Sequence, residues 1–484
     1  MSLTHMCDRE RGWSEVPLVK TWQLIAGSAV AGLALSAAMV ATAGPWDSGQ
    51  RKAERDRAAS WSRTGGADHA AGGLPQAAPS APGVLGALAP RPNTGAAALA
   101  GALTPLLADP SLGTARGASV IDVATGQVLY ESGAGDPMTP ASTIKIATAS
   151  AALAALGPEH RIRTTVTPGA GPGEIVLVGG GDPSLTAKKK SPAGSGGSLV
   201  ALAADTAQAL KAAGTDTVTL GYDDSLYTGP VRHPIGRDEN IAPVTALTAD
   251  EGRPDDSTSG PVDRSDDPSR DTARSFAALL RDRGIKVGGE PARAKAPAGA
   301  QPLATTLSTP LAGLVERMLT NSDNDIAEAL ARQTALAAGR PASFEGGEQA
   351  VTEKLASLGL DLKGARFADG SGLNRADRLS TRLLTALLAK AADPRHPELR
   401  PVLTGLPVAG FTGTLRARNT GDSAAAGLVR AKTGTLTVAN GLAGTVVAPS
   451  GRLLAFAFLA ANTPDKTAAE KGLDKLAAAV AATP

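Results

Sequence analysis

The sequence of 484 residues contains few cysteines, histidines and aromatic residues. The scarcity of cysteine and histidine argues against disulfides and against the common kinds of metal site. The single cysteine, Cys7, cannot form an intramolecular disulfide, and no cysteine-based metal site can be built around it. Histidine occurs five times, with no pair at the helical spacing of zinc ligands: His5, His69, His160, His233 and His396. We therefore expect neither a metal nor a cofactor.

Neither sign of charge is in excess, because 48 lysines and arginines face 46 aspartates and glutamates, for a net charge of +2. We expect no nucleic-acid partner, since such proteins carry a strongly basic surface. Hydrophobic residues make up 42% of the chain and charged residues 19%, which is a globular composition, but aromatics only 3%. The predicted core is therefore mostly alanine, valine and leucine, in a chain long enough for two or three domains.

An apolar run marks the N-terminal region. Residues 21–43 carry no charge and are about long enough to cross ~30 Å of hydrocarbon as a helix. They are either a transmembrane anchor behind a cytoplasmic tail (1–20) or the hydrophobic part of a signal peptide, for which Ala41-Thr42-Ala43 offers a cleavage pattern. Both alternatives predict export. Residues 44–100, rich in Ala, Gly and Pro, are predicted to be a flexible linker.

Ordered structure is expected from about Pro105 onward, and residues 255–271 are expected to be an exposed loop. Strands are predicted at 118–122 and 127–131 as a hairpin, then at 175–178, 217–221, 428–432, 441–448 and 453–460. Helices are predicted at 146–156, 198–213, 272–283, 311–319, 326–338, 379–392 and 468–481. Because strands occur early and late, we expect an α/β (α+β) fold in which both ends of the chain complete one sheet.

Three short motifs occur once each, in this order: Ser142-Thr143-Ile144-Lys145, Ser322-Asp323-Asn324 and Lys432-Thr433-Gly434-Thr435. Each alone is weak, but the ordered set is typical of an active-site serine acyltransferase. No Ser-His-Asp triad competes, because no histidine falls in these segments. The segment Asp369 to Leu373 comes nearest to a nucleophile elbow but lacks its first glycine, so we interpret it as a loop beside the cleft.

Ser142 is the candidate nucleophile, and a serine hydroxyl needs a base within hydrogen-bond distance. If a helix begins at Ser142, Lys145 lies on the same face three residues later. An ordinary lysine is protonated at neutral pH, but partial burial beside a second cation, for which Lys432 is the candidate, would lower its pKa. At the helix N-terminus, the amide of Ser142 would be the first donor to an oxyanion.

The second motif is expected in a short break between helices. If this break is extended, Ser322 and Asn324 point to one side and Asp323 faces away. Ser322 could then relay a proton, and Asn324 could bind a substrate carbonyl and hold Lys145. A simple helix cap is the alternative interpretation, since Ser and Asn are favoured at such positions.

The third motif is expected where a strand ends near the cleft. Gly434 would let a ligand backbone approach closely, and an edge strand can pair with an extended peptide. The amide of Thr435 is the candidate second oxyanion donor. The hydroxyls of Thr433 and Thr435, with Lys432 nearby, are candidates to bind a terminal carboxylate.

With these motifs the chain resembles the D-alanyl-D-alanine carboxypeptidase/endopeptidase family, the class C low-molecular-mass penicillin-binding proteins that form serine peptidase family S13. The resemblance covers about Pro105 to the C-terminus. It implies a β-lactamase/transpeptidase-like catalytic domain formed by residues 101–159 and 303–484, with residues 160–302 as an inserted α/β module of one or two domains. Beyond the three motifs it rests on these segments: Gly179 to Pro183, Tyr222 to Ser225, Ala242 to Val244, Asp369 to Leu373 and Gly413 to Leu415.

The resemblance implies a serine-type D-Ala-D-Ala carboxypeptidase that cleaves peptidoglycan stem peptides through an acyl-enzyme on Ser142, with β-lactams as covalent inhibitors. It leaves DD-endopeptidase activity open. The expected location is extracytoplasmic, either anchored in the membrane through residues 21–43 or secreted to the cell wall. Two alternatives remain: a serine β-lactamase, which shares the motifs but lacks so long an insertion, and a non-catalytic cell-wall-binding or sensor module.

Overall fold

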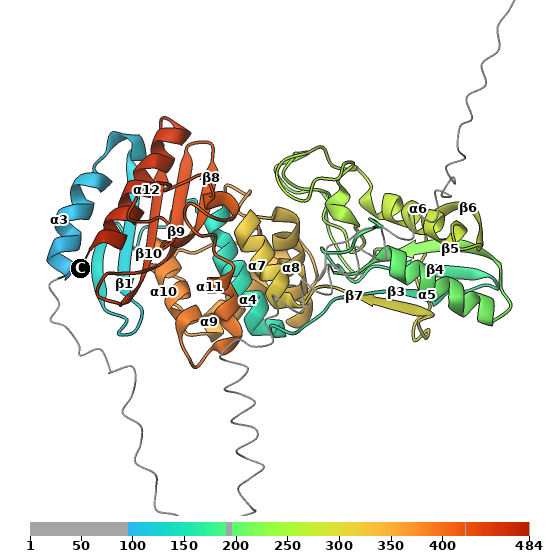
Figure 1. The fold of residues 1–484 in the computed structure, drawn as a ribbon. Helices are drawn as coiled ribbons and strands as arrows, with labels where there is room; N and C mark the ends of the chain where they lie inside the picture. The colour runs from blue at the N-terminus through green and yellow to red at the C-terminus, as the bar shows by residue number, and fades with distance from the viewer. Residues whose placement is uncertain (1–94, 190–195, 422, 484) are drawn as a thin grey trace, which may run out of the picture. The chain divides into compact units, whose positions relative to one another are not determined.

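A computed structural model describes residues 95–189, 196–421 and 423–483 (Figure 1). The expected anchor or signal segment (21–43) and most of the expected linker lie outside these residues. Within the described ranges, no helix combines the length and the apolar character that a membrane span requires.

Strands from both ends of the described chain form one antiparallel sheet, in the order β2-β1-β10-β9-β8. β1 pairs with β10 along its whole length, from Ala115 opposite Ala461 to Asp122 opposite Leu454. The prediction that the two ends complete one sheet is therefore confirmed. The strands are β1 (Ala115–Asp122), β2 (Val128–Ser132), β8 (Arg430–Leu436), β9 (Ala439–Val447) and β10 (Leu453–Ala461).

Helices cover both faces of this sheet (Figure 1). On β10, Phe456 and Phe458 belong to the core formed with α3 (Gly95–Leu107) and α12 (Lys466–Ala482). The alternating Ala455 and Ala457 belong to a second core, which contains α10 (Thr381–Ala392). This alternation explains why β10 is an unbroken apolar run, since a strand buried on both faces needs apolar residues at every position.

Helix α3 corrects the expected start of the ordered region. The linker was predicted to reach residue 100 and order to begin near Pro105, but the helix begins at Gly95. Leu99, Leu103 and Leu107 recur every four residues and are buried in one core with α12. This tertiary packing offsets the entropy of ordering an Ala-rich and Gly-rich segment.

On the side of the sheet that α10 covers, further helices pack against α10 and form a helical layer. Every residue of α4 from Lys145 to Leu153 is buried, so this helix runs through the core. The neighbouring helices are α7 (Leu311–Asn321), α8 (Asn324–Ala337), α9 (Phe344–Ser357) and α11 (Arg400–Thr404), and α4 itself is Lys145–Leu156. Short 3₁₀ turns are η2 (Pro110–Leu112), η3 (Ala141–Ile144), η4 (Asp250–Gly252), η5 (Pro397–Leu399) and η6 (Gly413–Leu415).

A second, mixed sheet forms within the inserted region, in the order β6-β5-β4-β3-β7. β5 is parallel to β4 and β6, and the crossovers carry α5 (Leu199–Ala212) and α6 (Pro268–Arg281). β3 is antiparallel to β4 and β7. The strands are β3 (Arg163–Pro168), β4 (Glu174–Val178), β5 (Thr217–Asp223), β6 (Lys286–Arg293) and β7 (Ala304–Leu307).

Two expected boundaries in this region shift. Leu307 pairs with Arg163, so the inserted sheet ends at residue 307 rather than 302. The loop expected at 255–271 ends earlier, because α6 begins at Pro268. Asp267 accepts a hydrogen bond from the amide of Arg270, and proline suits the first helical position.

Candidate active site

Ser142 lies in the 3₁₀ turn η3, which runs directly into α4. Side chains three residues apart eclipse one another in a 3₁₀ helix, which brings Lys145 over Ser142. Ala141 adopts φ = 46°, a left-handed conformation that costs energy for any residue except glycine. The backbone is therefore held in an unfavourable conformation directly before the candidate nucleophile.

Lys145 makes three hydrogen bonds through its buried amine. Nζ lies 2.9 Å from Ser142 Oγ, 2.7 Å from Asn324 Oδ1 and 2.5 Å from the carbonyl oxygen of Ser371. Burial lowers the pKa of Lys145 to about 8, against the opposing charges of nearby carboxylates, of which Asp369 is the strongest. Burial is thus the main cause of the lowered pKa. The expected cause was partial burial together with the charge of a second cation, Lys432.

The Ser322-Asp323-Asn324 segment differs from the extended break that was expected. Ser322 ends α7 with φ = 59°, and Asn324 is the first residue of α8. Asp323 does not face away but caps α8, accepting a hydrogen bond from the amide of Ile326 at 3.0 Å. The break consists of one left-handed C-cap and one N-cap. A helix cap is therefore present, but the N-cap is Asp323 and not one of the Ser and Asn residues on which the cap interpretation rested.

Asn324 connects Lys145 to the inserted module. Its Oδ1 accepts from Lys145, and its Nδ2 donates to the carbonyl oxygen of Asn240 at 2.9 Å. Both ends of the side-chain amide are therefore engaged, which fixes the orientation of the acceptor beside Lys145. The hydroxyl of Ser322 has no hydrogen-bond partner among the described residues, and Ser322 lines the same cleft as Ser142.

The Lys432-Thr433-Gly434-Thr435 motif lies inside β8, not after a strand ending at residue 432. Lys432 is fully buried, and its Nζ donates to the carbonyl oxygen of Thr433 at 2.8 Å. Burial, followed by the charges of Lys145 and Arg418, holds the pKa of Lys432 well below its usual range.

Gly434 allows a close packing contact within the protein. A Cβ atom at this position would lie 2.6 Å from the carbonyl oxygen of Pro140 and 3.1 Å from Cγ2 of Thr143. Real Cβ atoms do not approach a carbonyl so closely. The glycine therefore lets β8 pack directly against the turn that carries Ser142.

The two threonine hydroxyls of the motif have different partners. Thr433 Oγ1 donates to Thr414 Oγ1 at 3.0 Å, and both residues line the cleft. Thr435 Oγ1 donates to Glu470 Oε1 on α12 at 3.0 Å. The hydroxyl of Thr435, a predicted carboxylate ligand, is thus already engaged, whereas Thr414 was not predicted to be a site residue.

A cleft of about 380 Å³ brings together five predicted residues: Ser142, Ser322, Asn324, Thr433 and Thr435. Lys145 and Lys432 are buried and do not line this cleft. The inserted module supplies part of its wall through Asn240, Arg253, Ser259, Gly260 and Arg264, and Thr414 and Lys466 also line it. The three motifs therefore converge, as their order in the sequence had predicted.

Sequence reasoning missed one participant because it is a main-chain group. The carbonyl oxygen of Ser371 accepts from Lys145 and lies 3.4 Å from Ser142 Oγ. The adjacent Gly372 has φ = 84°, and a Cβ there would lie 2.1 Å from the carbonyl oxygen of Ala141. The glycines of the Asp369 to Leu373 segment were the available signal, because such residues allow a loop to pack this closely.

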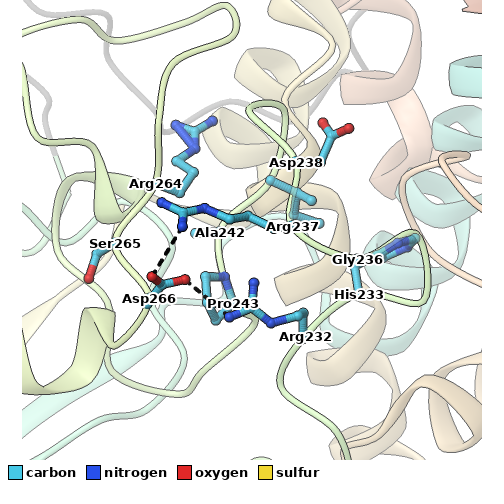
Figure 2. Close-up of a pocket in the computed structure, with 11 residues that line it drawn as sticks. Arg232, His233, Gly236, Arg237, Asp238, Ala242, Pro243, Arg264, Ser265 and Asp266 are labelled. Carbon is cyan, nitrogen blue, oxygen red and sulfur yellow. Dashed lines mark hydrogen bonds and ion pairs between the residues drawn. The ribbon is translucent and has the colours of Figure 1, made fainter.

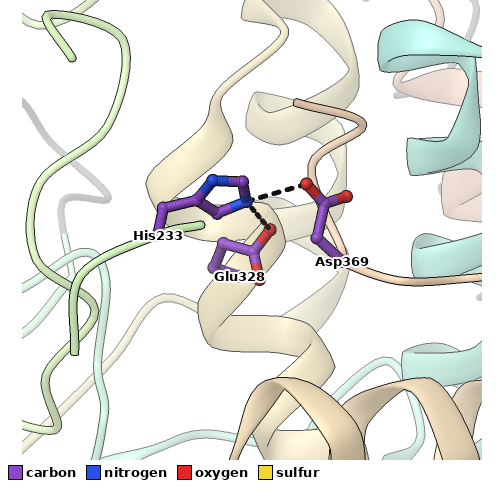
Figure 3. A group of neighbouring side chains, drawn as sticks. All are labelled: His233, Glu328 and Asp369. Carbon is purple, nitrogen blue, oxygen red and sulfur yellow. Dashed lines mark hydrogen bonds and ion pairs between the residues drawn. The ribbon is translucent and has the colours of Figure 1, made fainter. Parts of the chain in front are cut away.

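Among the described residues, two groups of histidine, aspartate and glutamate side chains bring possible metal-ligating atoms within 4.8 Å of one another. The first is His233, Glu328 and Asp369 (Figure 3). The second is Glu251, Asp323 and Asp325, in which burial and then the charge of Asp323 raise the pKa of Glu251 to about 8 and that of Asp325 to about 7. Three arginines pair with the second group, so we assign no metal there: Arg253, Arg264 and Arg317.

Comparison with known proteins agrees with this geometry. The sequence pattern of the D-Ala-D-Ala carboxypeptidase 3 (S13) family matches residues 99–261 and 254–480. Carboxypeptidase Rv3627c of Mycobacterium tuberculosis is 38% identical over 405 residues, which cover 80% of this chain and 85% of that protein. Carboxypeptidase DacB of Mycolicibacterium smegmatis is 38% identical over 412 residues, 82% of this chain and 88% of that protein.

Among solved structures, penicillin binding protein 4 (dacB) from Haemophilus influenzae superposes with a TM-score of 0.63 at 23% identity. The match covers 78% of this chain and 98% of that one, and it confirms the predicted fold class. Fold, motif order and sequence identity therefore agree that the chain belongs to the D-Ala-D-Ala carboxypeptidase 3 (S13) family.

Proposed function

We propose that Ser142 is the residue acylated in this serine D-Ala-D-Ala carboxypeptidase and that Lys145 is its general base. Membership of the family supports the reaction class. One observation carries the assignment: a buried lysine, whose pKa is lowered to about 8, lies 2.9 Å from Ser142 Oγ. The proposed substrates are peptidoglycan stem peptides that end in D-Ala-D-Ala.

Acylation starts when neutral Lys145 takes the proton of Ser142 Oγ, which bonds to the carbonyl carbon of the penultimate D-Ala. The main-chain amides of Ser142 and Thr435 donate to the resulting oxyanion. The bond from carbon to nitrogen then breaks. The proton held by Lys145 passes through the hydroxyl of Ser322 to the leaving amine, so free D-Ala departs and an ester remains on Ser142. The relay is supported by the place of Ser322 in the same cleft as Ser142.

In deacylation, Lys145 again acts as the base. Lys145 takes a proton from a water molecule, and the water oxygen bonds to the ester carbon while the bond to Ser142 Oγ breaks. The proton returns from Lys145 to Oγ, and the shortened peptide leaves as a carboxylic acid that loses its remaining proton to the solvent. Asn324 holds Lys145 in place during both steps, because its Oδ1 accepts from the amine and its Nδ2 is tied to Asn240.

The position of β8 supports a mode of substrate binding. β8 is the edge strand of its sheet, and an isolated bridge to Val408 covers its outer side at Arg430, before the motif. An extended stem peptide can add to such an edge by main-chain hydrogen bonds. The terminal carboxylate accepts from the hydroxyl of Thr414, because Thr433 donates to Thr414 and leaves the Thr414 proton available.

D-Ala release from a stem pentapeptide tests the assignment, together with intact-protein mass spectrometry after exposure to penicillin. The wild type and the Ser357→Ala control, on an exposed residue of α9, are expected to release D-Ala and to gain one penicillin adduct. Ser142→Ala is expected to do neither. Equal release by wild type and Ser142→Ala would refute the mechanism. Hydrolysis of the penicillin adduct within seconds would favour the β-lactamase alternative instead.

We further propose that the chain acts outside the cytoplasm on the cell wall, exported through residues 21–43. The apolar run and the wall substrate of the proposed reaction support this. Fractionation of the native host and N-terminal sequencing of the mature protein test it. Full-length protein in membranes indicates an anchor, and an N-terminus near Gly44 indicates a cleaved signal. Full-length protein in the cytosol alone would contradict export.

A further inference from the structure

We propose that His233, on the inserted module, is a positioning residue for acylation: through Asp369 it holds the loop whose Ser371 carbonyl receives the hydrogen bond of Lys145. The proposal rests on the function proposed above for Ser142 and Lys145. It gives the inserted module a part in the chemistry of the site in addition to forming a wall of the cleft.

His233 is completely buried and makes a hydrogen bond with each ring nitrogen. Nε2 lies 2.9 Å from Asp369 Oδ2, and Nδ1 accepts from the amide of Ile235 at 3.2 Å. Because Nδ1 accepts, the proton of the neutral ring lies on Nε2, which then donates to the carboxylate. The hydrogen bond from the amide of Ile235 therefore favours the tautomer of His233 that can donate to Asp369.

Asp369 also accepts hydrogen bonds from three groups of the loop that contains Ser371. Its Oδ1 accepts from the amide of Gly372 at 2.6 Å, and its Oδ2 accepts from Ser371 Oγ at 3.0 Å and the amide of Asn374 at 2.8 Å. His233 therefore supplies the fourth donor to a buried carboxylate. After the opposing effect of burial, the hydrogen bond from His233 is the first cause that lowers the pKa of Asp369 to about 2.

Glu328 on α8 holds the same loop from another side (Figure 3). Its Oε1 accepts from the amides of Gly370 and Ser371 at 3.0 and 2.9 Å, and it lies 4.0 Å from His233 Nε2. The Ser371 carbonyl shares its peptide plane with the amide of Gly372, which donates to Asp369 Oδ1, so the direction of this carbonyl is defined. That carbonyl lies 2.5 Å from Lys145 Nζ. Three steps of contact thus link His233 to the general base.

The segment carrying His233 is itself anchored. On either side of it, Arg232 and Arg237 pair with Asp266 at 3.1 and 3.4 Å (Figure 2). The ring packs edge-on against Phe344, with centroids 5.3 Å apart. Farther along, Asn240 accepts from Asn324, so the same stretch of the insertion contacts the site at a second point.

The alternative is that His233 only stabilises the fold, as many buried histidines do. A stabilising residue changes the unfolding temperature but leaves the kinetics of the folded fraction unchanged. A positioning residue changes kcat, because displacing a reacting group by about 1 Å costs on the order of 100-fold in rate. It leaves KM nearly unchanged, since His233 does not line the cleft. Glutamine at this position retains an N–H donor for Asp369, and alanine does not.

The test compares His233→Ala, His233→Gln and the control His396→Ala in the full chain, by D-Ala release and by the rate of penicillin acylation. We expect His233→Ala to lower kcat and the acylation rate by about 10- to 100-fold with KM changed less than about twofold. His233→Gln should recover most of the loss, and His396→Ala, on a partly exposed residue paired with Glu398, should match the wild type. Unchanged kcat in His233→Ala, equal losses in both variants, or a loss confined to KM would overturn the proposal.

Nitrogen NMR of the wild-type full chain with labelled histidine keeps the proposal testable if His233→Ala does not fold. The resonances of His233, assigned by their absence from His233→Gln, should show Nε2 protonated and Nδ1 unprotonated at neutral pH. A proton on Nδ1 would overturn the proposal. Failure of the proposed function is distinguishable, because it would appear as a wild type that penicillin does not acylate at Ser142.

Discussion

The amine of Lys145 and the main-chain carbonyl of Ser371, 226 residues apart in the sequence, meet at 2.5 Å. With Ser142 Oγ and Asn324 Oδ1, this carbonyl completes three acceptors around one buried nitrogen. Three acceptors leave the amine little rotational freedom, so its lone pair, once deprotonated, has a defined direction. The amine of Lys145 is thus positioned by groups from three separate segments.

The rate of acylation is expected to follow the titration of Lys145. Because burial lowers its pKa to about 8 and only the neutral amine can accept a proton, kcat/KM for D-Ala release should rise with pH and level off above about pH 8. Measurement from pH 6 to 10 with a stem pentapeptide checks this. A profile that is flat between pH 6 and 9 would rule out Lys145 as the titrating base.

Lys145→Met should separate activity from stability. We expect acylation by penicillin to fall by about 10²- to 10⁴-fold, the usual contribution of a general base. The pKa of Lys145 is lower in the folded state, at about 8, than in the unfolded state, where it has its ordinary value of 10.5. The contribution of this group to stability therefore rises as the pH rises between these two pKa values. Urea unfolding of the variant should lack that rise, and its stability at pH 7 should not be lower. A large loss of stability at pH 7 would contradict this account.

Asp377→Asn is expected to be tolerated, because burial and then the charge of Asp369 raise the pKa of Asp377 to about 10. The carboxyl is therefore protonated in the fold at neutral pH but ionised in the unfolded chain, and its contribution to stability falls as pH rises from about 4 to 10. Asparagine removes that fall, so urea unfolding at pH 7.5 should show equal or higher stability.

Asp369→Asn is the matched control, since Asp369 has a pKa of about 2 and four hydrogen-bond donors. It should be clearly destabilised, because an amide cannot satisfy the same set of donors. Equal destabilisation by the two asparagine variants would contradict the assignment of the proton to Asp377.

Gly434→Ala should damage activity more than stability. The added Cβ would lie 2.6 Å from the carbonyl oxygen of Pro140, so β8 or the Ser142 turn must shift. We expect the acylation rate to fall by about 100-fold, the order of loss produced by a displacement of about 1 Å. Gly288→Ala on β6 is the control, because its nearest atoms would be 3.8 Å away. Wild-type acylation by Gly434→Ala would show that this close approach is not required.

Leu103→Ala tests whether α3 is part of the folded domain. Leu103 is completely buried in the core shared with α12, and truncation of such a leucine costs about 2–5 kcal/mol of unfolding free energy. Leu106→Ala, at a partly buried position of the same helix, should cost less. Chemical denaturation measures both. If Leu103→Ala does not destabilise the protein, residues 95–107 belong to the linker and not to the folded domain.

Patterns within a few residues predicted much of this structure. The early hairpin, the helix after Ser142, and the late hairpin of β9 and β10 follow from local periodicity and turn residues. The Ser142 and Lys145 pair was predictable for the same reason, because a spacing of three residues is a contact along one turn. The order of the three motifs was enough to predict that Ser142, Ser322 and Thr433 would share a cleft.

Other features have no local signature. Helix α3 owes its order to burial against α12, and the hydroxyl of Thr435 is engaged by Glu470 from the last helix. His233, a lone histidine in the insertion, acquires a partner only because Asp369 lies beside it in the fold.

The sequence alone determined which reactive side chains this protein carries and which short segments hold them. Tertiary structure alone decided their environment: the burial that lowers the pKa of Lys145, the caps that shape the Ser322 break, and the carbonyl of Ser371. The physical reason is that desolvation and main-chain hydrogen bonding depend on what surrounds an atom. A carbonyl is the same in every residue, so only the fold selects the one that meets the lysine.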